Sequence, residues 1–196
     1  RTLGLLKRAE KYLTPLADNW FECSDSFYVY ESLVVGALHT QSVLLAFNRM
    51  PSGRVRFDTQ FTIFDGTNLW MRFGMLGKMG YLDFVLSSYL QHADSITRNA
   101  EKIALDTVKL QQHNLARLHG RLSLREKEQL RRRIADSFLS IGYLRSSKLD
   151  LREARAAYLE SMRWVVGIRA VSGYLKTCIP RMLWRAGRRN RHGGKF

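Results

Sequence analysis

The sequence predicts a mixed α/β fold that is predominantly helical. Hydrophobic residues make up 45% of its 196 residues and only three are proline, which is typical of a globular chain with an apolar core. Short runs rich in Tyr, Phe, Val and Leu lie in the first half of the chain, where they indicate strands among helices. From Arg98 onward the apolar residues recur at helical spacing, so the second half predicts helices.

The first part of the chain, residues 1–97, is expected to contain both helices and strands. Helical patterns at Leu5–Leu13 and Phe27–Leu38 precede a buried strand at Val43–Phe47. A further helix is expected from Thr67 to Leu76, because a glycine such as Gly77 commonly ends a helix. Strand-forming residues then fill Tyr81–Tyr89.

The second part, residues 98–180, is expected to be helical, with a loop at His119-Gly120. Ser123 and Glu126 have the spacing of a capping box and mark a helix start. One face of this helix carries Leu130, Ile134, Phe138 and Ile141. Asp150 and Glu153 begin the next helix, whose small-residue face comprises Ala154, Ala157, Tyr158, Ser161 and Met162. The two helices, joined around Ser146–Leu149, resemble one tetratricopeptide-type hairpin.

The third part, residues 181–196, is strongly basic. The chain has a formal net charge of +15, and the stretch from Val166 to Phe196 supplies eight basic residues and no Asp or Glu. Such a field attracts phosphate on a nucleotide, a nucleic acid or an anionic membrane surface. Three interpretations stay open: a membrane-surface helix that inserts Met182 and Trp184, a nucleic-acid patch, or a solvated terminus.

Other features of the sequence indicate the cellular location of the chain. No run of about 18 uncharged apolar residues is present, and the first residues do not form a secretory signal. The two cysteines, Cys23 and Cys178, match no metal-binding spacing and are expected to be free thiols in a reducing compartment. We therefore expect a cytoplasmic chain, peripheral on the inner face of the membrane if the basic tail binds lipid.

Residues 38–97 hold a series of short motifs in one order. They are Thr40 and Ser42, Phe57-Asp58, Leu69-Trp70-Met71-Arg72, Gly77, Tyr81-Leu82-Asp83, Tyr89, His92, Ser95 and Thr97. In order and spacing this series resembles the second half of the catalytic domain of inverting family 2 glycosyltransferases. The resemblance implies the C-terminal part of a nucleotide-sugar transferase domain, cut off before its nucleotide-binding half, followed by a helical extension. A partner chain that completes the fold is then expected.

The resemblance also implies a chemistry. A sugar hydroxyl is a poor nucleophile, so an inverting enzyme needs a carboxylate to take its proton as it attacks the anomeric carbon. The donor is a nucleotide sugar and the acceptor a saccharide or a lipid-linked saccharide. A divalent metal, Mg²⁺ or Mn²⁺, is expected to neutralise the leaving diphosphate. The main metal motif of the family, Asp-x-Asp, precedes the residues present in this chain.

This sequence departs from the family pattern at the charged positions. Asp65 falls on the Glu of the family's acidic pair, and Gly66 falls on its catalytic Asp. Asn68 replaces an acid, Ala46 stands where a basic residue is common, and Leu90 replaces the Arg of the Tyr-Arg-x-His motif.

Five residues remain as site candidates. Asp65 is the candidate base, although an Asp at this position also suits a helix N-cap. Candidates for substrate or diphosphate binding are His92, Arg72, Thr40 and Ser42, and His92 is also the candidate metal ligand. Structural roles compete with these: His92 can bond backbone, Arg72 can anchor its helix through an ion pair, and Asp58 is expected to form a turn.

Three functions are compatible with the sequence. The first is sugar transfer with inversion from a nucleotide sugar. The second is a catalytically degenerate homologue of these enzymes that acts as a binding or scaffold protein, which the losses at Gly66 and Leu90 favour. The third is a basic RNA-associated protein of a large assembly, which the net charge favours.

Overall fold

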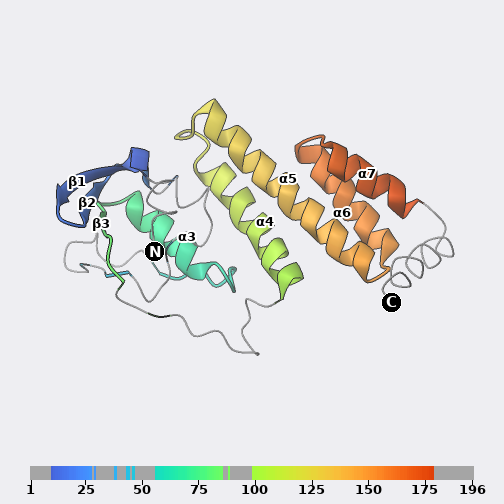
Figure 1. Cartoon of the computed structure of the whole chain (residues 1–196), viewed down its shortest axis with the longest axis horizontal. Coiled ribbons are helices and arrows are strands. Elements are labelled where there is room, and N and C mark those ends of the chain that lie inside the picture. Colours follow the sequence, from blue (N-terminus) through green and yellow to red (C-terminus); the bar gives the residue numbers. More distant parts are fainter. Residues whose placement is uncertain are drawn as a thin grey trace, which may run out of the picture. The chain divides into compact units, whose positions relative to one another are not determined.

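The structure is a computed structural model that describes residues 10–27, 29, 38, 43, 44, 46, 56–85, 88 and 99–178. These residues form a mixed, mostly helical fold with a three-stranded antiparallel sheet, as the sequence predicts at this level (Figure 1). The chain divides into two compact units. Unit 1 comprises residues up to Asn99 together with Lys109–Ser123, and unit 2 comprises Ala100–Val108 and the residues from Leu124 on.

Unit 1 contains a small antiparallel sheet. A 3-10 turn, η1 (Glu10–Tyr12), leads into β1 (Leu13–Ala17), which pairs with β2 (Trp20–Cys23), and β2 pairs with β3 (Gly80–Leu82). The hairpin between β1 and β2 turns at Asn19, which has a φ of 61°, a conformation that suits Asn in tight hairpins. The sheet packs on a cluster of Tyr12, Cys23 and Phe27.

The helix α3 (Asp65–Gly74) is the other described element that lies wholly in unit 1. Its residues Leu69, Trp70 and Phe73 are buried together, and the Trp70 and Phe73 rings stack with their centroids 6.2 Å apart. The helix begins two residues before the predicted Thr67. The helix ends at Gly74, two residues before the predicted Leu76, and the carbonyls of Met71 and Phe73 accept bonds from the amides of Met75 and Gly77.

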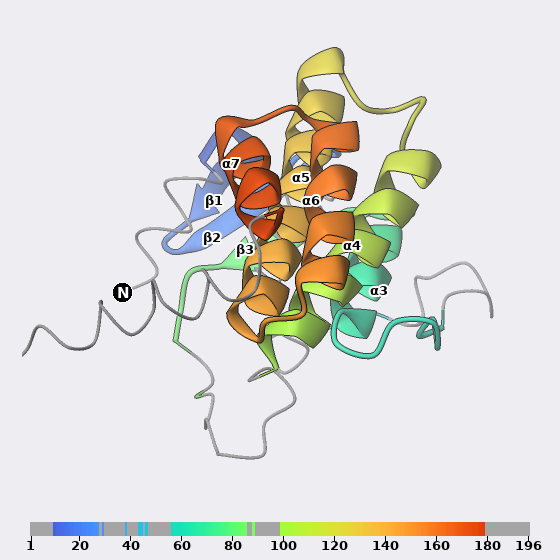
Figure 2. The ribbon, with the colours of Figure 1, turned by 90° about the vertical axis from the view of Figure 1, so that its right-hand side faces the viewer.

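Unit 2 is built from helices. The first residues of α4 (Ala100–Arg117) belong to it, with α5 (Leu124–Ser147), α6 (Leu151–Trp164) and α7 (Ile168–Thr177). The predicted apolar face of α5 is buried at Leu130, Ile134 and Ile141. It packs on α6, and α7 packs on both (Figures 1 and 2). The helical hairpin is therefore confirmed.

The turn between α5 and α6 is closed by backbone and side-chain bonds. The amide of Asp150 bonds the carbonyl of Arg145, and the amide of Leu149 bonds that of Ser146. This is a Schellman ending, and it places Leu149 at a φ of 63°, where glycine is usual. Asp150 then caps α6, because its side chain accepts a bond from the amide of Glu153. The predicted helix start at Asp150 is confirmed.

The ring of Tyr158, on α6, lies against both α5 and α7. A Cβ atom on Gly142 of α5 would lie 2.6 Å from the Tyr158 Cε1 atom, and one on Gly173 of α7 would lie 2.5 Å from it. The Tyr158 hydroxyl lies 3.3 Å from the Ser146 Oγ atom. Glycine is thus required at both helical positions because the aromatic ring occupies the place of a side chain.

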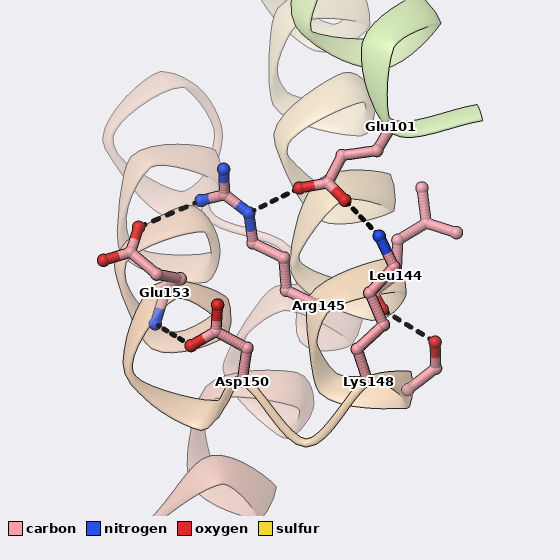
Figure 3. Close-up of polar contacts among 7 residues, drawn as sticks. Glu101, Leu144, Arg145, Lys148, Asp150 and Glu153 are labelled. Atoms are coloured by element: carbon pink, nitrogen blue, oxygen red, sulfur yellow. Dashed lines mark hydrogen bonds and ion pairs between the residues drawn. The ribbon is translucent and has the colours of Figure 1, made fainter. Parts of the chain in front are cut away.

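Charged side chains join α4, α5 and α6 at one end of unit 2 (Figure 3). Arg145 pairs with Glu101 at 2.9 Å and with Glu153 at 3.2 Å, and Lys148 pairs with Glu101 at 2.6 Å. The hydrogen bonds from Lys148 and then from Arg145 hold the pKa of Glu101 below its ordinary value. The side chains of Arg145 and Glu101 are each 23% exposed, so this pair is partly shielded from solvent.

Some predictions about the first part are wrong. Among the described residues of the predicted buried strand at Val43–Phe47, Val43, Leu44 and Ala46 lie in no strand, and Leu44 is 97% exposed. Leu13 begins β1 and does not end a helix, because it pairs with Cys23. The strand expected at Tyr81–Tyr89 ends at Leu82, since β2 offers pairing partners to only three residues of β3.

Two further expectations concern the ends of the chain. The residues before Glu10 and the basic tail, residues 181–196, lie outside the described residues. Among the helices that the structure describes, none combines the length and the apolar character needed to cross a bilayer.

We expect Gly142→Ala and Gly173→Ala each to lower the free energy of unfolding by about 1–3 kcal/mol, because the new methyl group would overlap the Tyr158 ring. Urea unfolding followed by circular dichroism measures the change. Gly120→Ala is the matched control, since a Cβ there meets nothing within 4 Å. Equal stability of all three variants would contradict the role of the ring.

We expect Glu101→Gln to lower stability by about 1–2 kcal/mol at neutral pH, because two charge-assisted bonds are lost. A carboxyl whose pKa is depressed in the fold stabilises above its unfolded pKa and loses that effect as the pH falls. The difference between the variant and the wild type should therefore begin to shrink as the pH falls below about 4.3, the ordinary pKa of Glu, and vanish only below the lowered pKa of Glu101. Glu160→Gln, which removes an exposed pair with Arg163 within α6, should change stability by less than about 0.5 kcal/mol.

Candidate functional site

The candidate base, Asp65, is the first residue of α3. Phe64 is the N-cap and makes no side-chain capping bond, so the N-cap role suggested for Asp65 is wrong by one residue. The carboxylate nevertheless serves the helix start, because its Oδ1 atom accepts a bond from the amide of Gly66 at 2.8 Å. Among the described residues, none bonds its Oδ2 atom. One oxygen of a half-buried carboxylate is thus left to accept a proton or a hydrogen bond.

Buried polar groups lie beside Asp65 in the same helix. Asn68 is fully buried, and neither atom of its amide has a hydrogen-bond partner among the described residues. The indole nitrogen of Trp70 is also buried without one. Asn68 follows Asp65 by three residues, so the two side chains share one side of the helix. Unpaired buried groups are rare in proteins and are often satisfied by water or by a ligand.

The other end of α3 carries Arg72. Its guanidinium donates a hydrogen bond to the carbonyl oxygen of Arg56, so the helix is anchored through a backbone carbonyl, where the sequence suggested an ion pair. Burial lowers the pKa of Arg72, the positive charge of Arg117 lowers it further, and Asp58 opposes both. Arg72 therefore lies near the charged side chains of Asp58 and of Arg117, which is in the second half of α4.

Asp58 forms a turn, as the sequence predicts. Its carboxylate accepts bonds from the Gln60 side chain at 2.7 Å and from the Gln60 amide at 3.2 Å. These bonds, the side-chain bond first, hold the pKa of Asp58 below its ordinary value, and the nearby Arg72 and His113 act in the same direction. Asp58 is thus held as a carboxylate by local bonds.

His113 and Arg117 of α4 complete this group of charged side chains, and sequence reasoning missed them. The His113 ring packs edge-on against Phe61 with centroids 5.5 Å apart. Burial, and then the positive charge of Arg117, lowers the pKa of His113. Both residues lie in a segment assigned to the helical extension, and no local motif marks them. We name Asp58, Arg72, His113 and Arg117 the basic cluster.

The structure describes two of the five predicted site residues, Asp65 and Arg72. Asp65 and Arg72 are seven residues apart on α3, which places them on one side of the helix about 10 Å apart along its axis. Thr40, Ser42, His92 and Leu90 lie outside the described residues.

The expected Mg²⁺ or Mn²⁺ has no ligand set in the part that the structure describes. No group of three or more His, Cys, Asp or Glu side chains there is arranged to hold a metal ion.

The two thiols differ in environment. Cys23 is buried, and burial, with the charge of Glu22 beside it, raises the pKa of its thiol to about 11. Cys178 is exposed. Since the thiolate is the nucleophile, Cys23 is unsuited to nucleophilic chemistry near neutral pH. Both are free thiols, as predicted.

Comparison of the chain with protein-family models, with curated proteins and with solved structures finds no match. The functional assignment therefore rests on the residues and on their geometry.

We expect stability to fall as the pH drops from about 7 to 5, because His113 is held neutral in the fold and gains a proton more readily when unfolded. Urea midpoints measured across this range should show the slope. His113→Gln should reduce the slope, and His119→Gln, which changes an exposed histidine, should leave it unchanged. An unaltered slope in His113→Gln would show that other groups carry the pH dependence.

Proposed function

We propose that this chain carries the acceptor-side part of an inverting family 2 glycosyltransferase, with Asp65 as the catalytic base. The observation that carries the proposal is the placement of Asp65 in the first turn of α3, with one carboxylate oxygen unbonded among the described residues. The helix then buries Leu69 and Trp70, and a strand with Tyr81 and Leu82 follows. This is the helix, turn and strand order that the motif series implies.

The proposed reaction moves one proton and one glycosyl group. The Oδ2 atom of Asp65 takes the proton of the acceptor hydroxyl while the hydroxyl oxygen forms a bond to the anomeric carbon. The bond from that carbon to the diphosphate oxygen breaks on the opposite face, so the configuration inverts and the nucleoside diphosphate leaves with the electron pair.

The basic cluster supports a substrate with negative charge. Arg72 and Arg117 outnumber the single carboxylate of Asp58, so the end of α3 opposite Asp65 is electropositive. We assign this charge to attraction of the donor diphosphate or of a phosphate on a lipid-linked acceptor.

We also propose that a further part of the enzyme covers the exposed apolar residues and the sheet edge of unit 1. Leu44 is 97% exposed, Val85 75%, Phe84 64% and Trp20 52%, and β1 presents mostly exposed residues at a sheet edge. Apolar side chains of this kind, and an edge strand that pairs on one side only among the described residues, are normally covered. A donor-binding part, from a partner chain or from further residues of the same protein, is the cover that this function requires.

A second candidate is a degenerate homologue that binds saccharide without transferring it. Gly66 and Asn68 are buried in the first turn of α3 and are uncharged where the family carries acids. A binding protein needs no base, and a buried amide is easier to keep in an apolar helix face than a buried carboxylate.

The test is Asp65→Asn in the protein that contains this chain, assayed with nucleotide-sugar donors, Mg²⁺ or Mn²⁺, and release of nucleoside diphosphate. The rate should fall by at least about 10², since a general base typically contributes 10²–10⁴. The Asn oxygen can still accept the Gly66 amide, so the melting temperature should stay the same. Asp18→Asn, an exposed turn residue, is the matched control and should leave the rate unchanged.

Two outcomes would contradict the assignment. An active wild type that is indifferent to Asp65→Asn would place the base elsewhere. An inactive wild type in which Gly66→Asp produces transfer would establish the degenerate homologue.

A further inference from the structure

We propose that α7 lies on an anionic membrane surface, with its outward apolar face in the lipid boundary and its basic residues on the headgroups. The proposal rests on which side of α7 packs against the protein, and it does not depend on the sugar-transfer assignment.

The side of α7 that faces the protein is fixed by small residues. Ala170 and Thr177 are buried, and Gly173 lies against the Tyr158 ring. With about 3.6 residues per turn, these three positions share one side of the helix. Ile168 and Leu175 lie on the opposite side of the helix by the same geometry, and α7 packs on α5 and α6 (Figure 2).

The opposite side of α7 is apolar. Ile168 is 81% exposed and Leu175, seven residues later, is 60% exposed. Val166, directly before the helix, is 77% exposed. An outward helix face normally carries polar residues, so the exposed Ile168 and Leu175, with Val166 exposed just before the helix, indicate a surface that an apolar partner covers.

The positive charges beside this apolar face favour a lipid surface with negative headgroups. Arg169 and Lys176 are exposed on one flank of the apolar face. From Val166 to the end of the sequence there is no Asp or Glu, and the residues after Cys178 add six Arg or Lys. Apolar residues flanked by cations without any acid are typical of helices that lie in the interface of anionic bilayers.

The experiment is sedimentation of the full chain with vesicles of phosphatidylcholine, with and without about 30% phosphatidylglycerol. We expect binding to the anionic vesicles, and we expect Ile168→Gln with Leu175→Gln to weaken it about tenfold or more, because two apolar side chains lose their burial in lipid. Both residues are exposed, so the variant should fold. Leu124→Gln with Tyr143→Gln, 85% and 71% exposed in the wild type, is the matched control and should bind as the wild type does.

A second readout separates the helix from the basic tail. Cys178, exposed just after α7, is accessible to an environment-sensitive maleimide dye, whereas Cys23 is buried and should react far more slowly. Anionic vesicles should shift the dye emission to the blue in the wild type, and this shift should be lost in the Ile168 and Leu175 variant.

Several results would overturn the proposal. They are absence of binding to anionic vesicles, equal binding to neutral ones, full binding and dye shift by the Ile168 and Leu175 variant, or a self-association in solution that this variant abolishes. The last result would assign the face to a second copy of the chain.

Discussion

The arrangement of unit 2 depends on one aromatic ring between two glycines. Tyr158 of α6 lies against Gly142 of α5 and Gly173 of α7 so closely that neither position has room for a methyl group. A glycine inside a helix costs about 0.5–1 kcal/mol relative to alanine, so two such residues need a compensating interaction. Burial of the ring provides it, and the contact between the Tyr158 hydroxyl and Ser146 satisfies the polar end of the side chain.

The contact between Tyr158 and Gly173 also determines which residues of α7 are exposed. Because Gly173 must face the ring, the rotation of α7 about its axis is determined, and Ile168 and Leu175 are placed on the outside. The apolar face that we assign to a membrane is thus a consequence of the core. At the N-terminal end of α6, Arg145 of α5 forms ion pairs with Glu153 in the first turn of α6 and with Glu101 of α4. These pairs connect the start of α6 to α4 and α5.

The helix α3 has a comparable position in unit 1. Its buried aromatic residues fix it, and its two ends carry opposite charges: Asp65 is in the first turn and Arg72 in the last. This polarity complements the helix dipole, so both residues have a structural reason to be where they are. The catalytic proposal adds a role for the Asp65 oxygen that the helix start does not use, and a role for the positive charge that Arg72 shares with Arg117.

The sequence by itself determined the local features of this protein. The cap at Asp150, the apolar face of α5, the small-residue face of α6, the end of α3 near Gly77 and the turn at Asp58 all follow from contacts between residues a few positions apart. The tertiary structure decided what depends on distant partners. Leu13 became a strand because Cys23 pairs with it, Tyr81 and Leu82 formed a strand only as far as β2 extends, and His113 and Arg117 joined Arg72 across more than 40 residues. Local hydrogen bonds and hydrophobic periodicity depend on residues a few positions apart, so they can be predicted from the sequence. Sheet pairing and charge clusters involve chain segments that meet only when the protein folds.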